Sequence, residues 1–163
     1  MAQNRRIKGV GFQLIIRSGS VTEAVQKAIV EGLEDVGKQY KNQVKKTIGL
    51  QDHSLEDLRK MGHPYRVGGP EDSVHGDDRI VHRQSGTLYN SIKLQPVSQE
   101  TSRRFTVYVS SDHPMLQGII YGTPTMRPRR FHEKAYEDIK DKYWSPLMDA
   151  LKKVNLRISG YEQ

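Results

Sequence analysis

The sequence predicts a single α+β domain over residues 1–163, with a mainly antiparallel sheet and helices packed on it. Apolar residues follow a period of two at positions 10–16 and again at 105–109, which indicates strands. They recur at helical spacing over positions 21–48 and 131–154, which indicates amphipathic helices. The order strand, long helix, loop, hairpin and helix is typical of α+β domains. We therefore expect about three to five strands, with a long N-terminal helix and a C-terminal helix packed on the sheet.

The N-terminal part should form one strand and the longest helix of the chain. The strand at residues 10–16 is ended by a Ser-Gly pair, and Ser20 with Glu23 then forms a capping-box signature for the helix. Gly32 and Gly37 lie inside this helix. Because glycine is unfavourable in a helix interior, they predict either a bend or a close contact with a neighbouring element.

The middle of the chain, residues 62–83, is predicted to be a long irregular loop. It follows a short helix expected at residues 54–61, is rich in Gly, Pro, Asp and His, and has no sustained period. Irregular segments longer than about 12 to 15 residues are uncommon inside compact domains and usually bind something or are mobile. We interpret this loop as a candidate assembly arm.

The second half of the chain should supply a hairpin and the terminal helix. Apolar positions within residues 88–97 predict a strand, which the polar link 99–103 joins to the strand at 105–109. Residues 116–121 fit either a short strand or a helical turn. Pro146 should kink or restart the terminal helix.

Composition and charge limit the classes of protein. Lys and Arg number 26 against 19 Asp and Glu, but acidic and basic residues are interleaved, and no known DNA- or RNA-binding motif is visible. There is no cysteine, which excludes disulfides and thiolate zinc sites. No segment has the roughly 18 apolar residues of a membrane span, and the N-terminus lacks the layout of a secretory signal. We expect a soluble protein, made in the cytoplasm, without a membrane partner.

The sequence contains no recognisable catalytic or cofactor-binding motif. His75, Asp77, Asp78 and His82 share one loop, but metal ligands normally come from rigid elements at tight spacings. Neighbouring carboxylates in an irregular segment rarely converge for acid-base catalysis. Nucleophile-elbow, dinucleotide and phosphate-loop patterns are also missing. We therefore expect no enzymatic activity, no metal and no cofactor.

The densest basic cluster is Arg127, Arg129 and Arg130, directly before the terminal helix. Basic residues before a helix N-terminus are not favoured by the helix dipole. Guanidinium groups suit phosphate or carboxylate partners. The cluster is either a solvated basic loop or a surface that meets an external acidic group.

Three short motifs follow one another in the second half of the chain, and a looser fourth, His63-Pro64-Tyr65, precedes them. The three are Ser85-Gly86-Thr87-Leu88-Tyr89-Asn90-Ser91-Ile92, Tyr121-Gly122-Thr123, and Arg127-Pro128-Arg129-Arg130-Phe131 followed by Ala135. In this order, and after an N-terminal strand and long helix, they resemble a family of siphophage head-tail joining and tail-completion proteins.

The resemblance implies a structural subunit of the virion neck, assembled in the host bacterial cytoplasm. It implies a ring of identical subunits, commonly sixfold, between the capsid connector or adaptor and the tail-tube proteins. A lumen that passes DNA would give the net positive charge a use in non-specific phosphate contact. A small basic nucleic-acid-binding protein is the alternative, and a hydrolase that uses the loop carboxylates is a third hypothesis. Under the first interpretation the candidate interface residues are His63, Pro64, Tyr65, Asp77, Asp78, Gly122, Thr123, Arg127, Arg129 and Arg130.

Overall fold

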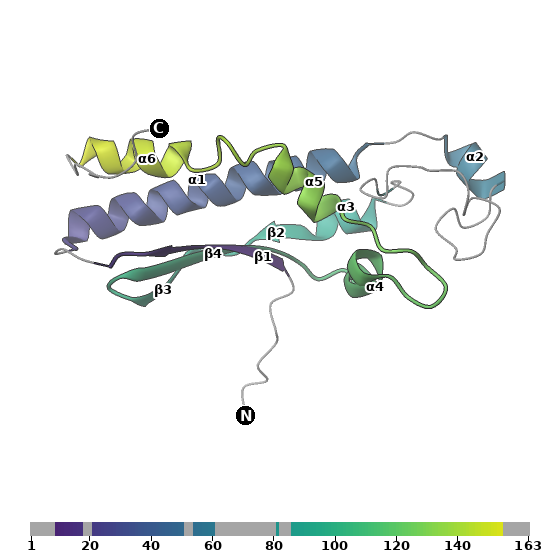
Figure 1. Cartoon of the computed structure of the whole chain (residues 1–163), viewed down its shortest axis with the longest axis horizontal. Coiled ribbons are helices and arrows are strands. Elements are labelled where there is room, and N and C mark those ends of the chain that lie inside the picture. The colour runs from purple at the N-terminus through teal and green to yellow at the C-terminus, as the bar shows by residue number, and fades with distance from the viewer. Residues whose placement is uncertain (1–8, 18–20, 51–53, 61–80, 82–85, 155–163) are drawn as a thin grey trace, which may run out of the picture.

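Helix α1 covers one face of a four-stranded antiparallel sheet, and helices α5 and α6 pack on α1 (Figure 1). This arrangement confirms the predicted α+β class. The computed structural model describes residues 9–17, 21–50, 54–60, 81 and 86–154. Most of the predicted loop at 62–83 lies outside these ranges, although Val81 belongs to the buried core.

Strand β4 (Arg104–Ser111) lies in the middle of the sheet. One of its edges pairs with β1 (Gly9–Ile15). The other edge pairs with two short strands in succession, β2 (Ile92–Leu94) and β3 (Ser98–Thr101). All three neighbours run antiparallel to β4. Because β4 is the only strand with partners on both sides among the described strands, β1 forms one outer edge of the sheet and β2 with β3 forms the other.

The predicted hairpin is only partly realised: of the first strand expected within residues 88–97 only β2 forms, and β3, which makes the hairpin with β4, lies mostly in the predicted link. Strand β3 continues to Thr101, so the turn is confined to residues 102–103 and the predicted link at 99–103 is too long. Residues expected to begin the first strand of the hairpin form helix α3 (Thr87–Ser91). The prediction of a strand there is wrong, and the reason is that the pattern was ambiguous: Leu88 and Ile92 are four residues apart, which places them on one face of a strand. That spacing also fits one helical turn, and both side chains are buried.

Helix α1 (Glu23–Ile48) has 26 residues, which corresponds to a length of about 39 Å. Its N-cap is Thr22, whose side chain accepts a hydrogen bond from the backbone N–H of Val25, and not the predicted Ser20. The helix ends at Gly49, as predicted. Its buried stripe faces the sheet on one side and helices α5 and α6 on the other.

Gly32 and Gly37 provide close contacts between α1 and its neighbours. A Cβ atom at Gly32 would lie 2.7 Å from the Cα atom of Leu147 in α6. A Cβ atom at Gly37 would overlap the side chain of Leu94 in β2. Of the two alternatives predicted for these glycines, close approach of a neighbouring element is the one observed.

The predicted terminal helix is divided into α5 (Phe131–Glu137) and α6 (Ser145–Lys153). Pro146 lies in the first turn of α6, which confirms the predicted restart. The interruption begins earlier than Pro146, however. The intervening segment places the ring of Tyr143 5.4 Å from that of Phe12 in β1 and 4.7 Å from that of Trp144.

Two shorter helices complete the described elements. Helix α2 (Leu55–Lys60) agrees with the short helix predicted before the loop. Residues 116–121, for which strand and helical turn were both open, form helix α4 (Leu116–Tyr121). None of the helices in the described part of the chain combines the length and apolar character needed to cross a membrane.

The core lies between α1, the sheet and α5. Tyr40 is fully buried at its centre and packs edge-on against Phe12, with ring centroids 5.2 Å apart. Four apolar side chains from α3 and the sheet are also buried in it: Leu88, Ile92, Phe105 and Val107.

Replacing Gly32 by alanine should destabilise the protein in spite of the better helix propensity of alanine. The added methyl group would meet the backbone of α6, which cannot move alone, so we expect a loss of about 1–3 kcal/mol in the free energy of unfolding. Gly37→Ala should cost less, because the end of the Leu94 side chain can rotate away. Urea denaturation of both variants measures the difference. Equal stability of Gly32→Ala and the wild type would contradict the close approach.

Candidate protein interface

Residues 115–130 fold into a compact unit at the end of the sheet, here called the α4 hook (Figure 1). It consists of helix α4, a turn at residues 122–126 and a returning segment that leads into α5. Arg129 closes the hook, because its backbone N–H donates to the carbonyl of Ile119 at 2.7 Å. The hook is thus defined by its own backbone hydrogen bonds.

Gly122 allows the chain to reverse after α4. Its φ of 76° lies in the left-handed region, and a Cβ atom there would be 2.9 Å from the carbonyl oxygen of Met126 and 3.0 Å from Pro128. Thr123 and Met126 then exchange backbone hydrogen bonds of 2.8 and 3.1 Å. Because of this positive φ and these short distances, a side chain at position 122 would open the turn.

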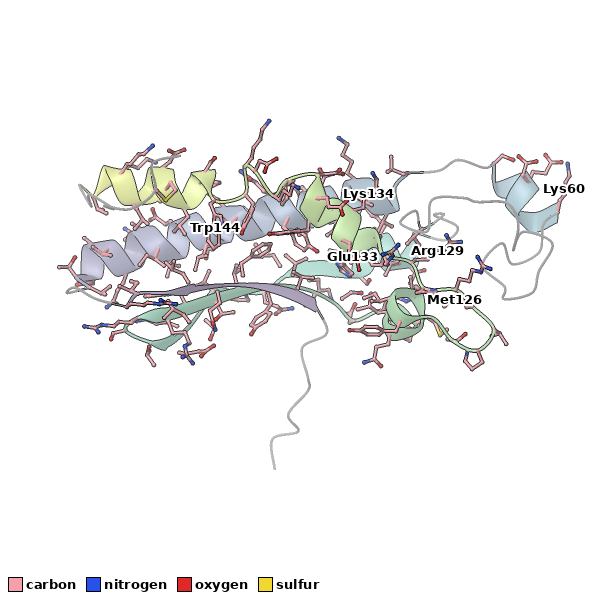
Figure 2. The ribbon with its side chains drawn as sticks, viewed as in Figure 1. Lys60, Met126, Arg129, Glu133, Lys134 and Trp144 are labelled. Atoms are coloured by element: carbon pink, nitrogen blue, oxygen red, sulfur yellow. The ribbon has the colours of Figure 1, made fainter. Side chains whose placement is uncertain are left out.

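The inside of the hook is packed against α4. A Cβ atom at Gly118 would lie 3.2 Å from the Thr123 side chain and 3.5 Å from Met126, so the turn folds directly onto the helix. In Figure 2, Met126 lies beside helix α4. Leu116 at one end of the hook and Phe131 just after the other are both buried in the core. These two side chains fasten the hook to the domain.

The outside of the hook exposes large apolar side chains beside arginines. Met115 is 52% exposed and Tyr121 is 78% exposed. Arg127 and Arg130 are exposed on the returning segment. A guanidinium nitrogen of Arg130 lies 3.5 Å from a carboxylate oxygen of Glu133. Tyr, Met and Arg are enriched at protein–protein interfaces. The hook has the composition of a contact surface.

Residues 86–92, the described part of the first motif, build the root of the hook. Gly86, with a φ of 76°, precedes α3, and Ser91 at the end of α3 lies 2.6 Å from the hydroxyl oxygen of Ser111 at the end of β4. Ser91 donates to the carbonyl of Leu88, and Ser111 accepts from the backbone N–H of His113. This buried serine pair fixes the direction in which the chain leaves the sheet toward α4.

The structure brings only part of the predicted interface together. Gly122, Thr123, Arg127 and Arg130 all lie in the α4 hook. Arg129 differs from its neighbours because its side chain is buried, so the arginine cluster does not present a single face. The remaining five candidates lie outside the described residues: His63, Pro64, Tyr65, Asp77 and Asp78.

Sequence reasoning did not predict the exposure of Met115 and Tyr121. Both residues are apolar and flank an apolar run, which by itself indicates burial. Only the structure shows that Leu116 is buried, whereas Met115 and Tyr121, at the two ends of α4, remain exposed. The signal in the sequence was Gly122, which marks Tyr121 as the last residue before a reversal.

No metal centre is formed in the part of the chain that the structure describes, where no three His, Asp or Glu side chains gather. The loop residues considered for metal or carboxylate chemistry are not among the described residues: His75, Asp77, Asp78 and His82.

Comparisons of the chain with protein-family models, with curated proteins and with solved structures find no match.

His132 anchors the end of the hook to α1. Its ring stacks on Phe131 at 4.1 Å between centroids, and its Nδ1 atom lies 3.1 Å from the hydroxyl oxygen of Tyr40. Its Nε2 atom is buried without a hydrogen-bond partner among the described residues. Burial lowers the pKa of His132 to about 4 and raises the pKa of the Tyr40 hydroxyl far above its usual value. Both groups are therefore neutral at pH 7.

Acid should weaken the fold through His132. The pKa is about 4 in the folded chain against 6.5 ordinarily, so between these values the unfolded chain binds a proton that the folded chain does not. The contribution of His132 is complete above pH 6.5 and is lost as the pH falls, by about 3 kcal/mol at pH 4. Urea denaturation at a series of pH values measures this slope.

The variant His132→Gln should flatten the slope, because glutamine keeps a polar group near Tyr40 but does not titrate. His113→Gln is the control, since His113 lies before α4 and does not contact α1 through any described hydrogen bond. If His132→Gln retained the full pH dependence of the wild type, His132 would not be its source.

Proposed function

We propose that this chain is a structural subunit of the neck of a tailed bacteriophage, where it joins the capsid connector to the tail tube. It acts by shape and contact, without catalysis. Its partners are further copies of itself in a ring, commonly sixfold, together with the connector or adaptor and the tail-tube proteins. Its place is the head-tail junction of the virion.

The observation that carries this proposal is the outer surface of the α4 hook. Tyr121 and Met115 remain exposed although the hook is held by its own hydrogen bonds and by two core anchors. An ordered, projecting unit with an apolar centre and flanking arginines is suited to bind another protein surface. A subunit whose task is to connect neighbours needs such a unit, whereas an enzyme needs a cleft with convergent polar groups.

The motifs that resemble the neck family support the same surface. The segment at residues 86–92 forms the root of the hook, Tyr121-Gly122-Thr123 forms its reversal, and residues 127–131 form its return into α5. The residues on which the resemblance depends are therefore those that build and orient the hook. This coincidence is expected if the hook is what the family uses for assembly.

Ring formation follows from a head-to-tail contact. If the hook of one subunit binds a different surface of the next, the contact repeats and closes when the rotation per subunit divides a full turn. The net charge of +7 is compatible with a lumen through which DNA passes, because phosphates would be met without base recognition.

The test at the level of the virus is removal of the gene from the phage that encodes this chain. Electron micrographs of the resulting lysate should contain filled heads and tails that have not joined, or tails of abnormal length. Complete, infectious particles in the absence of the protein would refute a role in the neck.

Tyr121→Ser should abolish assembly without unfolding the subunit. Loss of a central aromatic side chain from an interface typically weakens it by about 2–4 kcal/mol. The exposed position predicts a stability change within about 0.5 kcal/mol. Complementation of the deletion phage with plasmid-borne variants measures the first effect, and thermal unfolding measures the second.

Leu50→Ser is the matched control for Tyr121→Ser. Leu50 is also a large apolar side chain, 37% exposed, but it lies at the end of α1 outside the hook. Its replacement should leave infectivity unchanged. Equal infectivity of both variants would remove the hook from the proposal, and Met115→Ser would then be expected to have no effect either.

A further inference from the structure

The two outer edges of the sheet differ in how they are protected against further strand pairing. The edge made by β2 and β3 is interrupted by Pro96, carries the charged residues Lys93 and Glu100, and shifts its register between Gln99 and Thr101. Prolines, charges and irregular register are the usual means by which proteins prevent a strand from adding to a sheet edge. This edge is thus closed to a partner.

The opposite edge, β1, has none of these features. Its seven residues, Gly9–Ile15, include no charge and no proline, and they pair with β4 in continuous register. An uncharged, regular edge strand of this length is a template for another strand. The contrast within one sheet indicates that the β1 edge is left open for pairing.

The hydrogen-bond pattern identifies which backbone groups of β1 are available. Ile16 donates to the carbonyl of Arg103, so even-numbered residues of this strand exchange hydrogen bonds with β4. The N–H and C=O groups of the odd-numbered residues therefore point away from β4. These residues are Gly9, Gly11, Gln13 and Ile15. In the described part of the chain no backbone hydrogen bond reaches them from another segment.

We propose that β1 of a second copy of this chain pairs with this edge, antiparallel and about a two-fold axis at Phe12. In that register Gly9 faces Ile15 of the second copy, and Gly11 faces Gln13. All four outward-facing residues then lie in hydrogen-bonded pairs, which gives about eight hydrogen bonds across the axis. Because β1 carries no charge, the pair meets no electrostatic repulsion.

The helix layer adds to the contact near the same axis. The ring of Phe12 lies 5.4 Å from that of Tyr143, which in turn lies 5.7 Å from that of Tyr136. Tyr136 is 40% exposed. With Phe12 at the axis, the tyrosines of the two copies approach each other above the joined strands, where burial of their rings supplements the backbone bonds.

This inference does not depend on the proposed function, since it is drawn from β1 and its surroundings and not from the hook. In a single cyclic ring all subunits point the same way, so a two-fold pair belongs to the protein before assembly. One strand pair is a small interface. The dimer should therefore dissociate on dilution and be detectable at high protein concentration.

The test compares two replacements of Gln13 by sedimentation equilibrium over a wide concentration range. Gln13→Pro removes an N–H that points away from β4, so the subunit loses no internal backbone bond, but the dimer loses bonds at two symmetric positions. Gln13→Thr also loses the Gln13 side-chain contact with Thr106 but keeps the N–H. We expect dimerisation of the wild type and of Gln13→Thr, and a dissociation constant at least about tenfold higher for Gln13→Pro. Circular dichroism checks that all three fold.

A label at position 13 tests the two-fold register itself. The chain has no cysteine, so Gln13→Cys provides a unique site for pyrene. Across the proposed axis the two labels lie on one face of the joined sheet and should give excimer emission that disappears on dilution. A dimer without excimer emission, a dimer that is insensitive to Gln13→Pro, or a monomer at all concentrations would overturn the proposal. None of these outcomes affects the infectivity test of the hook.

Discussion

Helix α1 has to pack against two layers at once, and the positions of the other elements depend on how it does so. Its buried residues face the sheet on one side and α5 and α6 on the other. Gly32 and Gly37 make this possible, because at each the neighbouring element lies closer than a Cβ atom would permit. Tyr40, fully buried between them and the end of the helix, contacts Phe12 in the sheet and His132 in α5.

The same constraint separates the core from the surfaces available to partners. With α1 occupied on both sides, the edge strand β1 and the α4 hook contribute few of the fully buried side chains. Figure 2 shows side chains gathered between α1 and the sheet, while the hook lies beyond this layer. Changes at the exposed residues of the hook are therefore free to alter binding with little effect on stability, and changes under α1 have the opposite effect.

The sequence allowed prediction of those elements whose periodicity is long or strict. Helix α1, strands β1 and β4, and the restart at Pro146 follow from local pattern. Helix α3 was not predictable, because apolar residues four apart satisfy a strand and a helical turn equally. The break after Glu137 was also missed; the segment that follows it packs Tyr143 against Phe12, which is distant in the sequence. Such contacts are tertiary and leave no local signal.

The candidate site was predictable to a similar degree. Gly122 predicted a chain reversal because glycine has wide conformational freedom. Arg127 and Arg130 predicted a basic surface. The burial of Arg129 among them could not be foreseen, because it occurs where the returning chain meets α4 and the Arg129 backbone N–H donates to the carbonyl of Ile119. Exposure of single residues in a short segment is set by such returns of the chain.

The contacts proposed for the β1 edge and for the α4 hook have different symmetries, and the difference implies an order in which they would form. Pairing of β1 with its own copy is isologous and stops at two subunits, whereas contact of a hook with a different surface is heterologous and can continue around a ring. A junction between a capsid and a tail joins two unlike partners and so has a direction. A two-fold pair has none. If both contacts exist, the β1 pair must open before the subunits point the same way, and the weakness expected of a single strand pair is what would permit that exchange.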